Sequence, residues 1–118
     1  MKKLLLLVAL LIGSVSATWA ADHRVTVSDF VFTPSTLNAA VGDTVTFQWR
    51  SGMHTTTSTS VPPHARSWDA PMDSTHTRFR VKLRVAGTYS YHCIFHPAMV
   101  GTITVSATSP GKANPDTN

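Results

Sequence analysis

The chain has 118 residues and a formal net charge of +4 at neutral pH, with one cysteine and no glutamate. This length suits one compact domain and is short for two. The charge is too weak to indicate nucleic-acid binding, and no arginine–lysine block is interleaved with aromatic residues. The lack of glutamate disfavours a glycosidase site built from paired carboxylates.

The N-terminal segment MKKLLLLVALLIGSVSATWA has the layout of a secretory signal peptide. Lys2 and Lys3 precede an apolar run over residues 4–12 that is too short to span a bilayer. We expect residues 1–20 to be the signal peptide, with cleavage after Ala20; cleavage after Ala17 and an uncleaved anchor are the alternatives. Loss of the two lysines lowers the formal charge from +4 to about +2. The sequence thus predicts an exported, soluble, periplasmic protein.

The rest of the chain is rich in short strand patterns. Residues 23–32 carry apolar positions with a slip at Ser28-Asp29, which we interpret as a β-bulge. A turn is expected at Gly42-Asp43, and residues 44–50 alternate apolar and polar side chains. Further strands are expected in the segments TRFRVKLRVAG, TYSYHC and VGTITVSA.

The segment TRFRVKLRVAG alternates most sharply, and its two sets of side chains should face opposite ways. The inward set is Phe79, Val81, Leu83 and Val85. The outward set is Arg78, Arg80, Lys82 and Arg84. A solvated sheet face is the simplest interpretation of the basic row, and a docking face for an acidic partner is the alternative.

No segment shows a helical period over three turns, so the predicted fold is all-β, an antiparallel sandwich of two sheets. Residues 21–107 form the predicted domain, and residues 108–118 a disordered tail with little to bury. Residues 51–76 are predicted to be a long polar connection, either functional or poorly ordered, with Trp68 and Met72 as its apolar anchors.

One cysteine, two histidines and one methionine lie in the segment YHCIFHPAM, residues 91–99. Cys93 ends an alternating strand and should face inward, while His96 and Met99 follow at intervals of three residues. Pro97 stiffens the loop between them. A lone cysteine cannot form an internal disulfide, and its thiol invites oxidation in an exported protein unless it is buried or bound. The spacing therefore predicts a metal site.

A fourth donor is needed, and His54 is the best candidate because it directly follows the strand at residues 44–50. Two imidazoles, a thiolate and a thioether form the ligand set of a blue-copper centre. A buried structural thiol is the plain alternative for Cys93. A Cys–His hydrolase is disfavoured because His92 should point away from Cys93 and no Asn or Asp is placed to orient a base.

Two stretches carry a family resemblance. GTYSYHCIFHPAMVGTITV resembles the C-terminal copper loop of the cupredoxins, and its C-x-x-H-x-x-M spacing is closest to the amicyanin branch. AAVGDTVTFQW, followed by His54, is similar to the upstream half of the family. The resemblance runs from about Val25 to Val105, with only residues 55–76 hard to match.

The resemblance implies a Greek-key β-sandwich that holds one copper ion, cycling between Cu(I) and Cu(II). His54, Cys93 and His96 would be the equatorial ligands and Met99 the axial ligand. The implied role is that of a monomeric one-electron carrier, not an enzyme. Its partners would be a protein redox donor and acceptor, for example a dehydrogenase, a cytochrome or an oxidase. Partner contact is expected on an apolar patch formed around His96 by Phe95, Pro97 and Ala98.

The sequence departs from the family at two places near the ligands. Thr55 stands where relatives commonly have an asparagine that ties the first histidine loop to the cysteine loop. Ile94-Phe95 stands where many have a hydroxyl residue and proline. These changes bear on the tuning of the site, since neighbouring polar groups orient ligands.

Two other functions remain open. The same fold could serve a periplasmic copper-binding or delivery protein, or the same residues could hold zinc without Met99. A second copper site built from Met72, His64 and His76 is a less favoured possibility.

Overall fold

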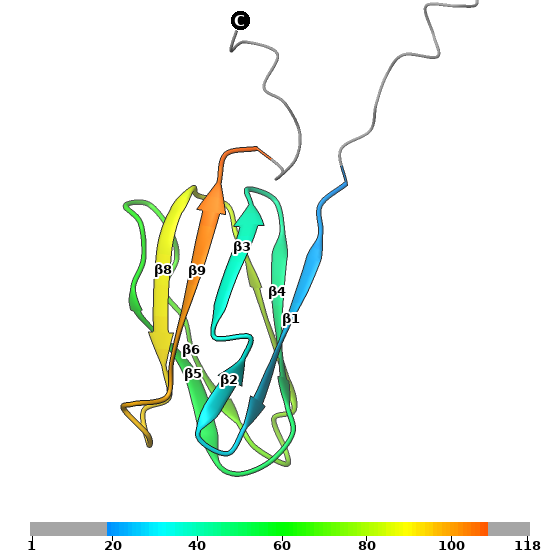
Figure 1. Ribbon diagram of the computed structural model, residues 1–118, viewed down its shortest axis with the longest axis vertical. Helices are drawn as coiled ribbons and strands as arrows, with labels where there is room; N and C mark the ends of the chain where they lie inside the picture. Colours follow the sequence, from blue (N-terminus) through cyan, green and yellow to red (C-terminus); the bar gives the residue numbers. More distant parts are fainter. Residues whose placement is uncertain (1–18, 109–118) are drawn as a thin grey trace, which may run out of the picture.

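The computed structural model describes residues 19–108, which form two β-sheets packed face to face (Figure 1). The predicted signal peptide lies outside this range except for its last two residues, and so does the predicted tail from residue 109 onward. No helix among the described residues is long and apolar enough to cross a membrane. The strands are β1 (Asp22–Ser28), β2 (Val31–Thr33), β3 (Thr36–Ala40), β4 (Thr44–Trp49), β5 (His54–Ser60), β6 (Asp69–Met72), β7 (Arg78–Lys82), β8 (Gly87–His92) and β9 (Val100–Ser106).

The all-β sandwich is confirmed, but the sheets are mixed and not purely antiparallel. The strand order is β2-β1-β4-β7 in one sheet and β3-β9-β8-β5-β6 in the other. The pairs β1–β4 and β3–β9 run parallel, and every other pair between neighbouring strands is antiparallel. Side chains alternate in the same way along parallel and antiparallel strands, so the sequence pattern carries no information on direction.

The core lies between the sheets and is built from the inward positions of the alternating strands. The Tyr91 ring sits at its centre, with its centroid 4.8 Å from that of Phe32 and 5.1 Å from that of Phe47. Both contacts are edge-to-face, the arrangement that aromatic quadrupoles prefer. Other fully buried side chains are Val25, Val27, Val45, Leu83 and Ile103. The strand that leads to Cys93 is thus anchored in the core between the sheets.

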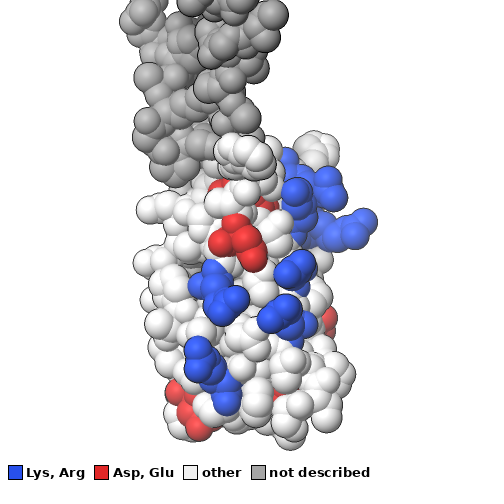
Figure 2. Space-filling view, turned by 90° about the vertical axis from the view of Figure 1, so that its right-hand side faces the viewer, with Lys and Arg blue, Asp and Glu red and all other residues white. Residues whose placement is uncertain are grey.

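The outward basic row on β7 is confirmed, because Arg78, Arg80 and Lys82 are all exposed, as is Arg84 just beyond the strand. Figure 2 looks onto the side of the molecule where β1 and β4 lie in Figure 1 and shows basic side chains spread along it. Arg24 of β1 and Arg80 flank Thr46 of β4 in one row across this sheet. We call the exposed cations of this sheet, Arg24, Arg78, Arg80 and Lys82, the basic flank.

The prediction of a polar connection over residues 51–76 is wrong, because two strands, β5 and β6, lie within it. The sequence of β5, HTTTSTS, lacks apolar alternation but is rich in β-branched threonine, which favours strands. Thr56 is fully buried and accepts a hydrogen bond from the indole nitrogen of Trp68 at 3.0 Å. The predicted anchors Trp68 and Met72 are both buried.

The slip at Ser28-Asp29 is a hairpin turn and not a bulge. Asp29 and Phe30 connect β1 to β2, and Ser28 pairs with Val31 across the turn. Phe30 has a φ of 66°, the left-handed conformation that is uncommon for a bulky side chain. β3 was also not anticipated, whereas the turn at Gly42-Asp43 is confirmed. The β1–β2 turn lies at the same end of the sandwich as the start of β5 and the loop after β8 (Figure 1).

Candidate metal centre

The loop from Cys93 to Met99 is closed by its own backbone hydrogen bonds. The Cys93 amide donates to the Met99 carbonyl at 3.0 Å, and the Met99 amide donates to the His96 carbonyl at 2.8 Å. A third bond runs from the His96 amide to the Cys93 carbonyl at 3.3 Å. These bonds fold the segment back on itself between β8 and β9. The loop therefore presents Cys93 and His96 from a fixed frame.

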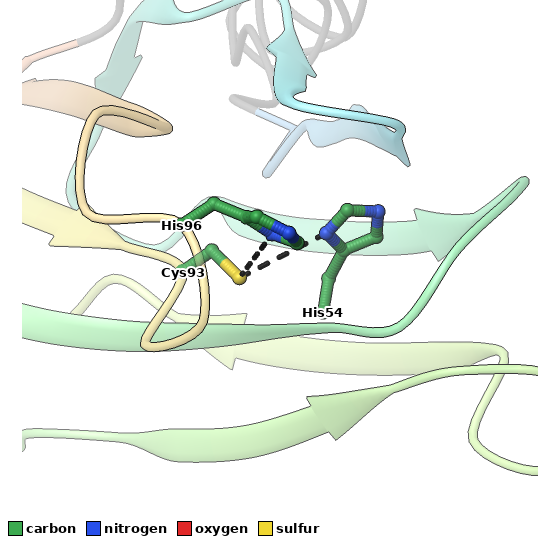
Figure 3. Close-up of side chains that lie close together, drawn as sticks. All are labelled: His54, Cys93 and His96. Carbon is green, nitrogen blue, oxygen red and sulfur yellow. Dashed lines mark hydrogen bonds between the residues drawn. The ribbon is translucent and has the colours of Figure 1, made fainter.

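Two strands bring the predicted donors together, since His54 begins β5 and Cys93 directly follows β8 (Figure 3). The Cys93 sulfur lies 3.8 Å from Nδ1 of His54 and 3.5 Å from Nδ1 of His96. The ring centroids of the two histidines are 5.1 Å apart. One ligand atom from each of the three residues lies within 4.8 Å of the other two. The structure thus assembles a thiol and two imidazoles that are 39 and 3 positions apart in the sequence.

These separations fit a metal ion. Metal–nitrogen bonds of about 2.0 Å and metal–sulfur bonds of about 2.3 Å, at trigonal angles, place the nitrogen and sulfur roughly 3.7 Å apart. The two sulfur–nitrogen distances, 3.8 and 3.5 Å, bracket that value. Cys93 and His54 are buried, whereas His96 is half-buried and reaches the surface. The Thr55 amide donates a hydrogen bond to the Cys93 sulfur at 3.4 Å. The donor set and its spacing both suit copper.

Thr55 also connects the start of β5, which carries His54, to the loop that carries Cys93. Its hydroxyl oxygen accepts a hydrogen bond from the Ile94 amide at 3.0 Å. Thr55 stands where relatives commonly have an asparagine, and the threonine hydroxyl makes this connection. The Thr55 hydroxyl also contacts that of Thr57 at 2.9 Å, so the link continues into β5.

The far side of the His54 ring meets a residue that sequence reasoning missed. Nε2 of His54 is buried and makes no hydrogen bond with the described residues. Oδ1 of Asp29, in the turn between β1 and β2, lies 3.5 Å from it. Nothing in the sequence pairs these residues, because the turn at residues 29 and 30 was not recognised.

Met99 is buried in the core beneath the loop, with 2% of its surface exposed. Its place in the closed loop is consistent with the predicted axial role, which stays a prediction. Met72 is also fully buried, while His64 and His76 are exposed. His76 instead pairs with Asp73 at 2.9 Å, and this hydrogen bond is the main cause that lowers the pKa of Asp73 to about 2. Among the described residues, His54, Cys93 and His96 form the only cluster of three or more His, Cys, Asp or Glu donors.

Apolar side chains surround the exposed edge of His96. Ile94 and Phe95 are 49% and 56% exposed, and Pro97 and Ala98 are exposed as well, as the sequence predicted for the last three. Phe30 adds an unexpected member, since its ring stands edge-on to His96 with centroids 4.9 Å apart. We call these five neighbours of His96 the apolar rim. An exposed apolar cluster of this kind is typical of a contact surface.

Comparisons with known proteins agree with this geometry. The profile of the cupredoxin-like domain family matches residues 3–105. No curated protein sequence matches the chain. Among solved structures, a pseudoazurin from Sinorhizobium is similar, with a TM-score of 0.66 and 26% identity over 73% of this chain and 74% of that one.

Amicyanins are similar to the same extent. The reduced state of an amicyanin variant has a TM-score of 0.63 and 29% identity over 77% of this chain and 86% of that one. Another amicyanin variant, in its Cu(I) form, has a TM-score of 0.63 and 25% identity over 72% and 82% of the two chains. The family match spans most of the sequence, and the sandwich and its cluster of donors agree with it. The chain belongs to the cupredoxin-like domain family.

Proposed function

We propose that this protein is a type 1 copper protein that carries single electrons between redox partners, with His54, Cys93, His96 and Met99 as the ligands of one copper ion. The observation that carries the proposal is the convergence of one thiol and two Nδ1 atoms at separations that a bound metal requires. Support also comes from the amicyanin structures, which include one in a Cu(I) form.

The residues of the chain form a largely buried, hydrogen-bonded site for the metal ion. Copper, when bound, supplies the one-electron couple between Cu(I) and Cu(II). The sulfur is held by the Thr55 amide, and the loop that carries it is closed by backbone bonds. Thiolate and thioether favour Cu(I), whereas imidazole suits both oxidation states. Because these donors cannot move far, a change of charge requires little rearrangement.

The apolar rim is the proposed contact surface for protein partners, because it encloses the one ligand that reaches the surface, His96. The basic flank would attract an acidic partner and speed its approach more than it tightens the complex. We further propose that residues 1–20 are a signal peptide and that the protein works as a soluble monomer in the periplasm. The apolar N-terminal run supports the signal peptide.

Copper loading of the purified apoprotein tests the function. Addition of Cu(II) should produce an intense blue or green thiolate-to-copper band with a stoichiometry of one ion per chain. Cys93→Ser should abolish the band, since its oxygen cannot replace the thiolate. His76→Ala is the matched control, because His76 is exposed and pairs only within its own turn; its spectrum should equal the wild type.

Other outcomes would decide for the alternatives. A colourless Cu(I) complex that exchanges slowly and does not oxidise to a coloured form would favour copper delivery. Tight zinc binding that copper does not displace, with no effect of Met99→Leu, would favour a zinc site. Either result would overturn the electron-carrier proposal.

A further inference from the structure

The two nitrogens of the His54 ring have different surroundings. Nδ1 faces the Cys93 sulfur, while Nε2 is buried with no hydrogen-bond partner among the described residues. The carboxylate of Asp29 lies 3.5 Å from Nε2. We propose that Asp29 is a positioning residue that accepts a hydrogen bond from protonated Nε2 of His54 and so keeps Nδ1 free for the metal. The metal in this statement rests on the proposed function, but the position of the proton is a property of the chain itself.

The chemistry of imidazole makes the choice of nitrogen decisive. A neutral histidine carries one ring proton, and the other nitrogen offers its lone pair. A proton on Nδ1 would occupy the lone pair that faces the sulfur of Cys93. A carboxylate beside Nε2 favours the opposite tautomer, in which Nε2 donates and Nδ1 accepts. Metal-binding histidines generally have such a partner on the second nitrogen, and its loss costs about 10- to 100-fold in metal affinity.

The distance of 3.5 Å is longer than a hydrogen bond, but the surroundings allow it to close. The Asp29 side chain is 58% exposed and is free to move by the few tenths of an ångström required, whereas the His54 side chain is fully enclosed. The Asp29 backbone is anchored, since its amide donates to the Ser51 hydroxyl at 3.1 Å. The turn that carries the carboxylate is therefore held next to the ring.

Gly52 keeps the space between the two groups clear. A Cβ atom at this position would overlap both Oδ1 of Asp29 and Nε2 of His54. Gly52 also has a φ of 82°, which residues other than glycine rarely adopt. Its carbonyl accepts the indole proton of Trp49 at 2.7 Å, which fixes this backbone. The contact between Asp29 and His54 thus depends on glycine at position 52, which the left-handed backbone there also favours.

The first test replaces Asp29 by asparagine in the purified protein. Long-range proton–nitrogen NMR spectra of the apoprotein identify which ring nitrogen of His54 is protonated. Wild type should carry the proton on Nε2, and Asp29→Asn should shift a measurable fraction to Nδ1. Its Cu(I) affinity should fall by about 10- to 100-fold. Asp29→Glu should restore most of the wild-type tautomer, because the longer carboxylate can still accept the hydrogen bond.

A matched control separates this effect from a general loss of negative charge. Asp22→Asn removes a carboxylate at the first residue of β1, at the end of this strand that is far from Asp29. This variant should leave both the His54 tautomer and the Cu(I) affinity unchanged. If it alters them as much as Asp29→Asn does, the effect is one of net charge and the proposal is wrong.

A second pair of variants tests the role of the gap. Gly52→Ala forces a methyl group against both carboxylate and ring, and it strains the backbone. Gly42→Ala imposes the backbone strain alone, because Gly42 has a φ of 99° but no atom within 4 Å of the added methyl. Both variants should lose stability, but only Gly52→Ala should change the tautomer and weaken Cu(I) binding.

The two proposals fail in different ways. If Asp29→Asn keeps the wild-type tautomer and its Cu(I) affinity stays within twofold, Asp29 has no positioning role, even when the thiolate–copper band is normal. If the wild-type protein forms no such band, the electron-carrier function is refuted. The NMR spectra of the apoprotein would still show whether Asp29 determines which ring nitrogen of His54 carries the proton.

Discussion

Gly101 faces Tyr91 across the β8–β9 ladder, and a Cβ on this glycine would lie 2.1 Å from the tyrosine ring. The ring therefore lies over the glycine backbone, where no other residue would leave room for it. This arrangement buries the Tyr91 hydroxyl, which has no hydrogen-bond partner among the described residues. The same burial raises the pKa of Tyr91. The aromatic centre of the core thus contains an unsatisfied polar atom two residues from Cys93.

Tyr91→Phe is expected to stabilise the protein. Removal of a buried hydroxyl without a partner relieves its desolvation penalty, a gain of about 1 kcal/mol in the free energy of unfolding. Tyr89→Phe is the matched control, because the Tyr89 hydroxyl donates to the Val85 carbonyl at 2.6 Å. Its loss should destabilise by about 1 kcal/mol. Urea unfolding of both variants measures the difference, and equal signs for the two would contradict the assignment.

Thr55→Val should loosen the connection between the two ligand loops. Valine has the shape of threonine but cannot accept the Ile94 amide proton, so a hydrogen bond of 3.0 Å is lost. We expect the free energy of unfolding to fall by about 1–3 kcal/mol, since a partly buried donor is left unpaired. Amide exchange at Ile94 should speed up as well. Thr88→Val, at an exposed position of β8, should change neither quantity.

The effect of substituting Phe30 on stability should depend on its left-handed backbone as well as on its ring contact with His96. Phe30→Ala removes the edge contact with His96 and should cost about 0.5–1 kcal/mol. Phe30→Gly removes the same contact but relieves the left-handed conformation, so it should be about 1 kcal/mol more stable than the alanine variant. In both variants the NMR signals of the His96 ring should show increased mobility. Phe95→Ala, which removes another member of the rim, should leave the His96 ring as it is in the wild type.

The pH dependence of the free energy of unfolding should show how much the Asp43 carboxylate stabilises the fold. Burial raises the pKa of this carboxyl group, but hydrogen bonds from His23 and from the Ala21 and Ala40 amides, each 2.9 Å long, outweigh burial and lower it below 3.8. A carboxyl group with a lowered pKa in the folded state stabilises the fold above its unfolded pKa. That contribution is lost as the pH falls through the folded value.

Asp43→Asn should therefore be less stable than wild type at pH 6, by about 1–3 kcal/mol. The difference should shrink as the pH falls below about 4, because the wild-type carboxylate becomes protonated there. Urea unfolding at several pH values between 6 and 3 measures it. Asp69→Asn provides the comparison, since this carboxylate is exposed and accepts one hydrogen bond, from Thr57. If the free energies of unfolding of Asp43→Asn and wild type differ by the same amount at pH 6 and at pH 3, the prediction is wrong.

The sequence was informative where chemistry or alternation is local. The spacing of Cys93 and His96 within one loop, with His54 after a strand, predicted the cluster, while the axial role of Met99 stays a prediction. The alternation of β4 and β7 predicted which of their side chains face the core. The strand β5 was missed because threonines carry its β-propensity without an apolar pattern. The parallel pairing of β1 with β4 was missed because side-chain alternation does not encode direction.

The contacts behind the ligands could not be predicted because they join distant segments. Asp29 reaches His54 only through the β1–β2 turn, whose two residues look like a slip in a strand pattern. Thr55 replaces an expected asparagine, and its hydroxyl still accepts the Ile94 amide proton. Which hydroxyl or carboxylate completes such a contact depends on loop geometry at the level of ångströms, and residue type alone does not specify it.

The two histidines of the candidate metal centre differ in burial. His54 is buried next to Asp29 of the β1–β2 turn and Cys93 is buried as well, whereas His96 is partly exposed. A partner docked on the apolar rim, as proposed above, would cover the same part of the surface that an ion would pass on its way to these residues. Occupancy of the rim by a partner would hold the ion in place for as long as the complex lasts.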